Sequence, residues 1–311
     1  MRKGRSGAIK PLPFVIKGVR VVKRFYYGGQ AVIEGVMMRG QKAMVTAVRR
    51  PHGELAIDTR PLPTLYTGQI RKTPLLRGVI VLIENLVLGI KSLLYSANVS
   101  LEEEGEEVSG GLVWLMVAVA LFLAVVLFFM VPLFLTRLFN INSSLLFNLV
   151  DGFIRMAIFI AYLKVMSLLP DIKRVFAYHG AEHKTVNAYE AGAPLEMAAV
   201  RKYSTAHVRC GTSFLFVVLL ISIFVFALVG LHSPWLMVLS RIVFIPVIAA
   251  LGYEVIYFGA RHINNGSVRA VLAPGLWLQA LTTREPDDSQ LEVALSALKG
   301  VIEADQLEEA T

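Results

Sequence analysis

Two histidines and a glutamate in the stretch YHGAEHKTVNAY, residues 178–189, are the side chains of this 311-residue sequence best suited to chemistry. The segment AEHKTVNAYEAG has a helical pattern that ends at Gly192. On such a helix His179 and His183 lie on one face, one turn apart, so both imidazoles can reach a single ion. Glu182 lies on the adjacent face, where it is placed to deprotonate a water at the metal.

This H-x-x-E-H arrangement, which one class of zinc proteases uses, predicts a divalent metal site with zinc as the preferred ion. The alternative is a helix at a membrane surface, whose histidines bond to lipid headgroups or to neighbouring carbonyl groups. A metal site needs at least one more protein ligand. Four residues outside the motif are candidates because they fall near the same ends of the apolar segments: His207, Cys210, Glu254 and His262.

Glu254 has a competing assignment, since it and Lys164 are both 19 residues from the starts of two apolar segments that run in the same direction. Asp151 and Arg241 are likewise both six residues in. Charges inside a membrane are expected to face protein or water and to pair with one another. The sequence therefore predicts an Asp151–Arg241 pair and leaves Glu254 either a metal ligand or the partner of Lys164. Cys210 is either a ligand or a small buried residue.

The elements that must position these residues are mostly apolar helices. Hydrophobic residues make up 55% of the chain and charged residues only 17%, and apolar residues gather into stretches of roughly 20, the length of a membrane crossing. The sequence predicts four membrane spans: residues 111–135, 145–169, 212–231 and 235–259. Residues 79–97 are interrupted by polar residues, which favours an interfacial or re-entrant helix.

The distribution of lysine and arginine predicts the orientation of these spans. Seventeen of the 31 basic residues precede residue 111 and six lie in the loop 170–211, which puts both termini and that loop in the cytoplasm. The single cysteine suits a reducing compartment, and we find no signal peptide. We attribute the net charge of +8 to basic segments near anionic lipid, above all an N-terminal arm, rather than to nucleic-acid binding.

The segments outside the spans predict a small cytoplasmic domain. After a basic flexible arm (residues 1–27), residues 28–78 form a β-rich unit, in which AMVTAVRR, PHG and ELAIDTR read as a hairpin. In GGQAVIEGVMMRG, turns bounding one strand are favoured over a role for Glu34 in a site. Residues 98–110 are an acidic linker, and the tail 260–311 contains an amphipathic helix. The predicted fold class is thus an α-helical integral membrane protein with about four transmembrane helices, a β-rich N-terminal unit and an amphipathic C-terminal helix.

Four motifs resemble those of the YqhQ-like family of bacterial polytopic inner-membrane proteins. They are GGQAVIEGVMMRG, YHGAEHKTVNAYE, HVRCGTSF and LQALTTREPDD, and the likeness runs from about residue 25 to residue 300. The family is a domain of unknown function that has been labelled a predicted metal-dependent enzyme. The resemblance therefore implies a multi-pass protein of the inner membrane and agrees with a metal site, without implying a substrate.

The leading functional prediction is a metal-dependent hydrolase with its site at the cytoplasmic membrane face, acting on a peptide or a lipid-linked substrate. Two alternatives come from other classes. A transporter or channel, which with so few spans would need a homo-oligomer, would use the intramembrane charges Asp151, Arg155, Lys164, Arg241 and Glu254. A non-catalytic scaffold would use the basic arm and the β-rich unit to recruit a cytoplasmic partner.

Overall fold

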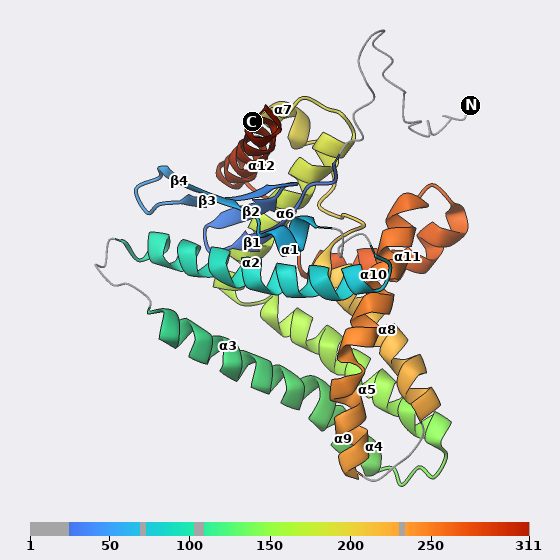
Figure 1. Cartoon of the computed structure of the whole chain (residues 1–311). Helices are drawn as coiled ribbons and strands as arrows, with labels where there is room; N and C mark the ends of the chain where they lie inside the picture. Colours follow the sequence, from blue (N-terminus) through green and yellow to red (C-terminus); the bar gives the residue numbers. More distant parts are fainter. Residues whose placement is uncertain (1–24, 69–72, 103–108, 230–233, 311) are drawn as a thin grey trace, which may run out of the picture.

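The computed structural model describes residues 25–68, 73–102, 109–229 and 234–310. It consists of a layered part, in which helices pack on a small sheet, and a set of long apolar helices beside it (Figure 1). The predicted basic arm lies almost entirely outside the described residues, and so does most of the predicted acidic linker.

Four strands form an antiparallel meander in the order β1-β2-β3-β4. They are β1 (Gly28–Val32), β2 (Gly35–Arg39), β3 (Ala43–Arg49) and β4 (Leu55–Pro61). The predicted hairpin is confirmed by the pairing of β3 with β4, and Gly53 in its turn has a φ of 94°, which glycine adopts readily. The GGQAVIEGVMMRG segment forms a second hairpin, β1–β2, instead of the single strand that the sequence indicated.

Helices cover both faces of the sheet, so that the two central strands are buried on both sides (Figure 1). One face packs against α6 (Pro170–Glu190) and α12 (Asp288–Ala310), and the other against α2 (Leu76–Ser100). Side chains alternate between these two layers as the strand pleat requires. Those that face α6 and α12 are Val36, Met38, Val45 and Ala47, and those that face α2 are Met37, Met44, Thr46 and Val48.

Helix α12 confirms the predicted amphipathic C-terminal helix. The four residues predicted to share its apolar face are all buried: Leu291, Ala294, Leu295 and Leu298. At its start, the Asp287 carboxylate accepts hydrogen bonds from the Gln290 backbone N–H at 2.9 Å and the Ser289 hydroxyl at 2.7 Å. Burial alone would raise the pKa of Asp287, but these hydrogen bonds hold it below its ordinary value.

Among the described residues, four helices are long and apolar enough to cross a membrane, or up to five if one bent pair counts as a span. The four are α2, the run α3 (Gly110–Val125), η3 (Val126–Met130) and α4 (Val131–Arg137), then α5 (Ser144–Met166) and α8 (Gly211–Val229). They indicate a membrane protein. Three of the predicted spans fall on α3–α4, α5 and α8, whereas α2 is an additional candidate.

The fourth predicted span, 235–259, is two helices rather than one. Helices α9 (Pro234–Val243) and α10 (Ile245–Arg261) meet at an angle of 42°. Pro246 lies in the first turn of α10, where a proline has no N–H to donate to the preceding turn. This explains why a segment that was predicted as one span forms a bent pair of helices.

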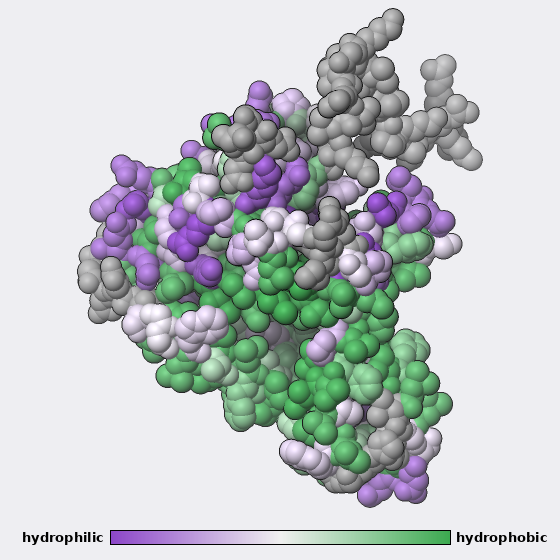
Figure 2. All heavy atoms as spheres, viewed as in Figure 1, coloured by the Kyte–Doolittle hydropathy of each residue, from purple (hydrophilic) through white to green (hydrophobic). Residues whose placement is uncertain are grey.

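Helix α2 lies between the layered part and the apolar helices (Figure 1). Its inner face is polar in places: Glu84 pairs with Arg39 of β2 at 2.8 Å, and the Ser92 hydroxyl lies 3.1 Å from that of Thr46. Its outer face exposes apolar side chains, among them Ile83 and Leu86. In Figure 2 the apolar surface begins at this helix and continues over the helices below it, while polar residues gather over the layered part.

The remaining helices are short, and the sequence analysis predicted none of them. They are α1 (Thr64–Thr67), α7 (Met197–Val200), α11 (Gly266–Leu278) and η4 (Gln279–Leu281). The segment that we interpreted as the start of a cytoplasmic tail forms α11, which packs against α8. The Asn265 side chain accepts a hydrogen bond from the Ser267 N–H at 2.9 Å, so Asn265 is the N-cap of this helix.

Candidate functional site

Helix α6 places the two motif histidines as the sequence predicted. Pro170 starts the helix, and Gly192, with a φ of 74°, follows its end. The imidazole rings of His179 and His183 are 4.4 Å apart between centroids. Gly180 lies against the chain before α12, since a Cβ there would be only 2.0 Å from the Arg284 carbonyl oxygen. Helix α6 is therefore pressed against the segment that leads into α12.

Backbone carbonyl groups fix the orientation of both imidazoles. His179 Nδ1 lies 2.8 Å from the Thr282 carbonyl oxygen, and His183 Nδ1 lies 2.5 Å from that of Thr205. Because a carbonyl oxygen only accepts, both Nδ1 atoms must carry the proton. The Nε2 lone pairs are then available, which is the arrangement that metal-binding histidines adopt in proteins.

Cys210 joins these histidines from the start of α8. Its Sγ lies 3.4 Å from His179 Nε2, and it accepts a hydrogen bond from the Thr212 backbone N–H at 3.4 Å. One ligand atom each from His179, His183 and Cys210 lies within 4.8 Å of the other two; we call these residues the His–Cys cluster.

His207 lies behind the His–Cys cluster rather than in it. Its ring is 5.6 Å from that of His183 between centroids, and its Nε2 is 3.5 Å from the Glu190 carboxylate. Burial opposes ionisation of Glu190, but the hydrogen bonds and charges of His207 and Arg209 lower its pKa below the ordinary value. Gln279 also holds the backbone of residue 207 through its N–H and its carbonyl group, at 2.9 and 2.8 Å.

Glu254 is neither in the His–Cys cluster nor paired with Lys164. It forms an ion pair with Arg77 of α2, and its carboxylate accepts a hydrogen bond from the Leu75 N–H at 3.1 Å. The cause is a close helix crossing that the sequence does not reveal: a Cβ on Gly78 would lie 2.8 Å from the Cα of Ala250. Only a glycine lets α2 approach α10 so closely, which brings Arg77 beside Glu254.

The remaining residues that were predicted to form ion pairs or to bind the metal lie outside the His–Cys cluster. The predicted Asp151–Arg241 pair is confirmed, at 3.1 Å, and the same carboxylate oxygen also accepts from Arg155 at 2.6 Å. His262 ends α10, where its ring stacks on Phe258 at 4.2 Å between centroids and takes no part in the His–Cys cluster. Lys164 is exposed at the end of α5.

Glu182 is held at the cluster by the first strand. One carboxylate oxygen accepts a hydrogen bond from the Gly29 N–H of β1 at 2.9 Å, and the other lies 3.6 Å from His183 Nε2. The side chain is buried, at about 4% of full exposure for the residue. The carboxylate thus lies beside the ligand atoms, in a position where it can accept a proton.

Gly29 is a contributor that the motif analysis did not identify. A Cβ at this position would lie 2.3 Å from the Met37 carbonyl oxygen and 3.0 Å from Glu182 Cγ. Glycine therefore lets β1 approach both β2 and the catalytic candidate. The paired glycines at the start of the strand were the available signal, but nothing in the sequence connects them with α6.

We expect Gly29→Ala to destabilise the folded protein by about 1–3 kcal/mol, because the new methyl group meets backbone that cannot move aside. The matched control is Gly28→Ala, since a Cβ on Gly28 meets nothing within 4 Å. Thermal unfolding of both variants in detergent measures the difference. Equal melting temperatures for the two variants would contradict the close packing of β1 on Glu182.

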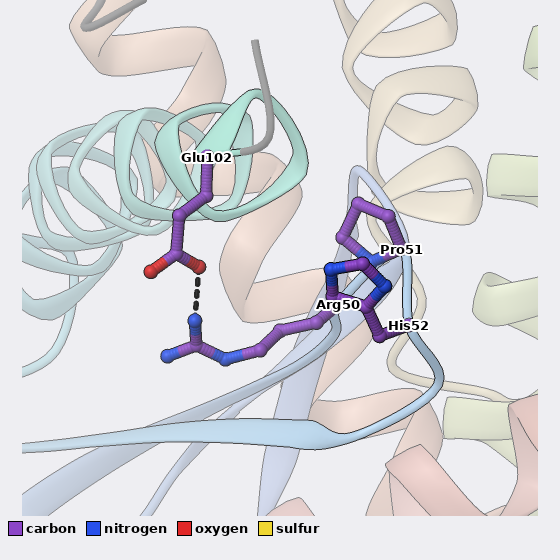
Figure 3. A pocket seen from close by; sticks show the side chains of 4 residues that line it. All are labelled: Arg50, Pro51, His52 and Glu102. Carbon is purple, nitrogen blue, oxygen red and sulfur yellow. Dashed lines mark hydrogen bonds and ion pairs between the residues drawn. The ribbon is translucent and has the colours of Figure 1, made fainter. Parts of the chain in front are cut away.

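A cleft of about 930 Å³ opens from the cluster. Its walls come from β1, β2, α2, α6, the start of α8 and the end of α10, and its lining includes His179, Glu182, His183 and Cys210. A smaller hollow of about 270 Å³ lies at the β3–β4 turn (Figure 3). There Arg50 pairs with Glu102 beside Pro51 and His52, and none of the cluster residues takes part.

The donor set at the cleft fits a divalent transition metal. Two imidazole nitrogens and one thiolate are ligands that zinc takes readily, and three protein ligands leave a position for substrate or water. A metal-binding imidazole is usually oriented by a hydrogen bond from its other ring nitrogen, and here each imidazole donates its Nδ1–H to a carbonyl group. The residues present are therefore chemically suited to hold such an ion.

Comparison with known proteins places the chain in a family. Residues 73–304 match the family described as "Protein of unknown function (DUF1385)". The chain is similar to "Uncharacterized protein YqhQ" of Bacillus subtilis (strain 168), with 35% identity over 303 residues that cover 91% of this chain and 94% of the relative. No solved structure matches. The family match covers the cluster, α2 and α12, and the chain therefore belongs to the DUF1385 family of proteins of unknown function.

Proposed function

We propose that this protein is a metal-dependent hydrolase whose ion is held by His179, His183 and Cys210. The observation that carries the proposal is the convergence of three ligand atoms within 4.8 Å in the lining of a cleft, with both imidazoles already oriented. A coincidental grouping of histidine and cysteine would not need two carbonyl groups to fix the tautomers. His207 belongs to the supporting residues in this proposal.

Glu182 is the general base of the proposed reaction. The Gly29 N–H holds one of its oxygens, which leaves the other directed to the cluster to accept a proton from water and return it to the leaving group. A bound divalent ion would polarise the scissile group and make the water more acidic.

We place the site at the cytoplasmic face of the bacterial inner membrane. The distribution of lysine and arginine supports this orientation, and α2 and α10, two of the cleft walls, belong to the apolar helices. A site at this level can reach substrates that are themselves anchored in the bilayer. The basic N-terminal segment would meet anionic lipid headgroups in the same orientation.

Elemental analysis of the purified protein tests the metal site. We expect about one equivalent of zinc or another divalent metal per chain, and its loss in the His179→Ala/His183→Ala double variant. The control is His262→Ala, because that histidine is exposed and outside the cluster. Absence of metal from both the parent protein and the control, after metal-replete expression, would refute the proposal.

A transporter is the second candidate, and one observation favours it. Asp151, Arg155 and Arg241 converge on α5 and α9, nearly fully buried, beside the break between α9 and α10. Lys164 and Glu254 lie apart from them, which leaves three of the five predicted charges together. Loss of ion flux in Asp151→Asn proteoliposomes, with folding retained, would favour this candidate. A scaffold role would leave both this variant and Glu182→Gln without effect.

A further inference from the structure

We propose that the cleft binds a phosphate-bearing amphiphile, with the anionic headgroup in the cleft and the acyl chains in the bilayer. The inference rests on the proposed hydrolase and names its substrate class. It is drawn from the arginines and tyrosines that line the cleft and from the helices that carry several of them.

Arginines and tyrosines line the cleft together with the cluster residues. Arg39, Arg209 and Arg261 all contribute to its wall, whereas Glu182 is the one acidic residue that lines it. Guanidinium groups present several N–H donors in a planar fork that matches phosphate oxygens. This lining favours an anionic ligand over a neutral or cationic one.

The three arginines differ in how far their charge is already neutralised. Arg39 pairs with Glu84 at 2.8 Å, and Arg209 pairs with Glu190. No carboxylate in the described part of the chain pairs with Arg261, which lies over the ring of Tyr257 at 4.8 Å from the centroid. Arg261 is therefore the cation at the cleft with charge left to offer a ligand.

The position of Arg261 relates the cleft to the membrane. Arg261 and Tyr257 end α10, and the neighbouring wall includes Val81 of α2. The outer sides of these same helices expose apolar residues such as Ile83 and Phe258. In Figure 2 the apolar surface begins at α2, so the cleft lies at the level where polar surface gives way to apolar surface. Tyrosine and arginine at this level are typical of residues that meet lipid headgroups.

The size of the cleft also fits this class. Its volume of about 930 Å³ is near the upper end of the range for small-molecule sites, roughly 300–1,000 Å³. A phosphorylated headgroup with its glycerol backbone occupies such a space, while acyl chains can leave along the apolar faces of α2 and α10.

Binding to purified protein in a neutral maltoside detergent tests the inference with three probes. Dioctanoyl phosphatidic acid carries both phosphate and chains, dioctanoylglycerol carries the chains alone, and glycerol 3-phosphate carries the phosphate alone. We expect phosphatidic acid to bind at least about tenfold more tightly than either of the others, and Arg261→Gln to weaken it about tenfold. The matched control is Arg269→Gln, because Arg269 is exposed on α11 and lies outside the cleft.

Each alternative outcome overturns a stated part of the inference. If dioctanoylglycerol binds as tightly as phosphatidic acid, the cleft does not recognise phosphate. If glycerol 3-phosphate binds as tightly, the ligand is a soluble phosphate ester rather than a lipid. If Arg261→Gln binds phosphatidic acid as tightly as the parent protein, the phosphate does not bind in the cleft at Arg261. Displacement of the lipid by an equal concentration of hexa-alanine would also show that the cleft is not specific for this ligand class. If the protein contains no metal after metal-replete expression but still binds phosphatidic acid through Arg261, the hydrolase is refuted and the lipid site stands.

Discussion

Replacing Asp151 by asparagine is expected to destabilise the apolar helices by about 3–5 kcal/mol. The Asp151 carboxylate accepts hydrogen bonds from Arg155 at 2.6 Å and from Arg241 at 3.1 Å, and all three side chains are only about 2% exposed. Asparagine leaves two buried guanidinium groups facing each other without a counter-charge. Removing one partner of a buried ion pair costs far more than removing the whole group.

Thermal unfolding in detergent, followed by near-ultraviolet circular dichroism, measures this effect. Lys164→Gln is the matched control, because it removes a charge from the same helix at an exposed position, and we expect less than about 0.5 kcal/mol. The triple variant Asp151→Leu/Arg155→Met/Arg241→Leu should regain most of the loss. An Asp151→Asn variant as stable as the control would show that the three charges are hydrated rather than mutually paired.

The same cluster illustrates what a sequence can predict about a helical membrane protein. Counting depth along two apolar segments identified the Asp151–Arg241 pair, since both residues lie on helices whose packing brings equal depths together. The same count failed for Lys164 and Glu254. It took no account of α2, which meets α10 through Gly78 and supplies Arg77 as the partner. Equal depth along two apolar segments therefore predicts an ion pair only where no third helix supplies another partner.

The candidate site also contains features that the sequence could predict and features that it could not. The helical spacing of His179 and His183 and the nearness of Cys210 to a span could be recognised, because both depend on local sequence. The carbonyl groups of Thr205 and Thr282 could not, because every residue has a carbonyl group and only the fold decides which one faces an imidazole. The contact of Gly29 with Glu182 joins residues 153 positions apart, a distance at which no sequence periodicity operates.

In the layered part, the hairpin β3–β4 and helix α12 followed from alternation, turn residues and helical spacing. The position of α2 could not be predicted in the same way. Its sequence is apolar enough for a membrane crossing, yet one face of it covers the sheet through Leu88 and Ser92. Periodicity identifies which residues share a helix face, but not whether that face meets lipid or a second layer of protein.

Glu182→Gln is expected to lower the rate of hydrolysis by about 10²–10⁴-fold while the protein keeps its metal. Glutamine preserves the shape of the side chain and its carbonyl oxygen can still accept the Gly29 N–H, so β1 and α6 stay in place. It cannot accept a proton from water at neutral pH. The His–Cys cluster is unchanged in this variant, so metal content should equal that of the parent protein.

Two measurements on the same preparation separate chemistry from folding. Mass spectrometry follows the consumption of dioctanoyl phosphatidic acid, and elemental analysis follows the metal. Glu196→Gln serves as the control, because Glu196 is exposed just before α7 and outside the cleft. Loss of metal together with activity would make Glu182 a ligand instead of a base. Full activity in Glu182→Gln would refute the general-base role, because no other carboxylate among the described residues that line the cleft lies at the cluster.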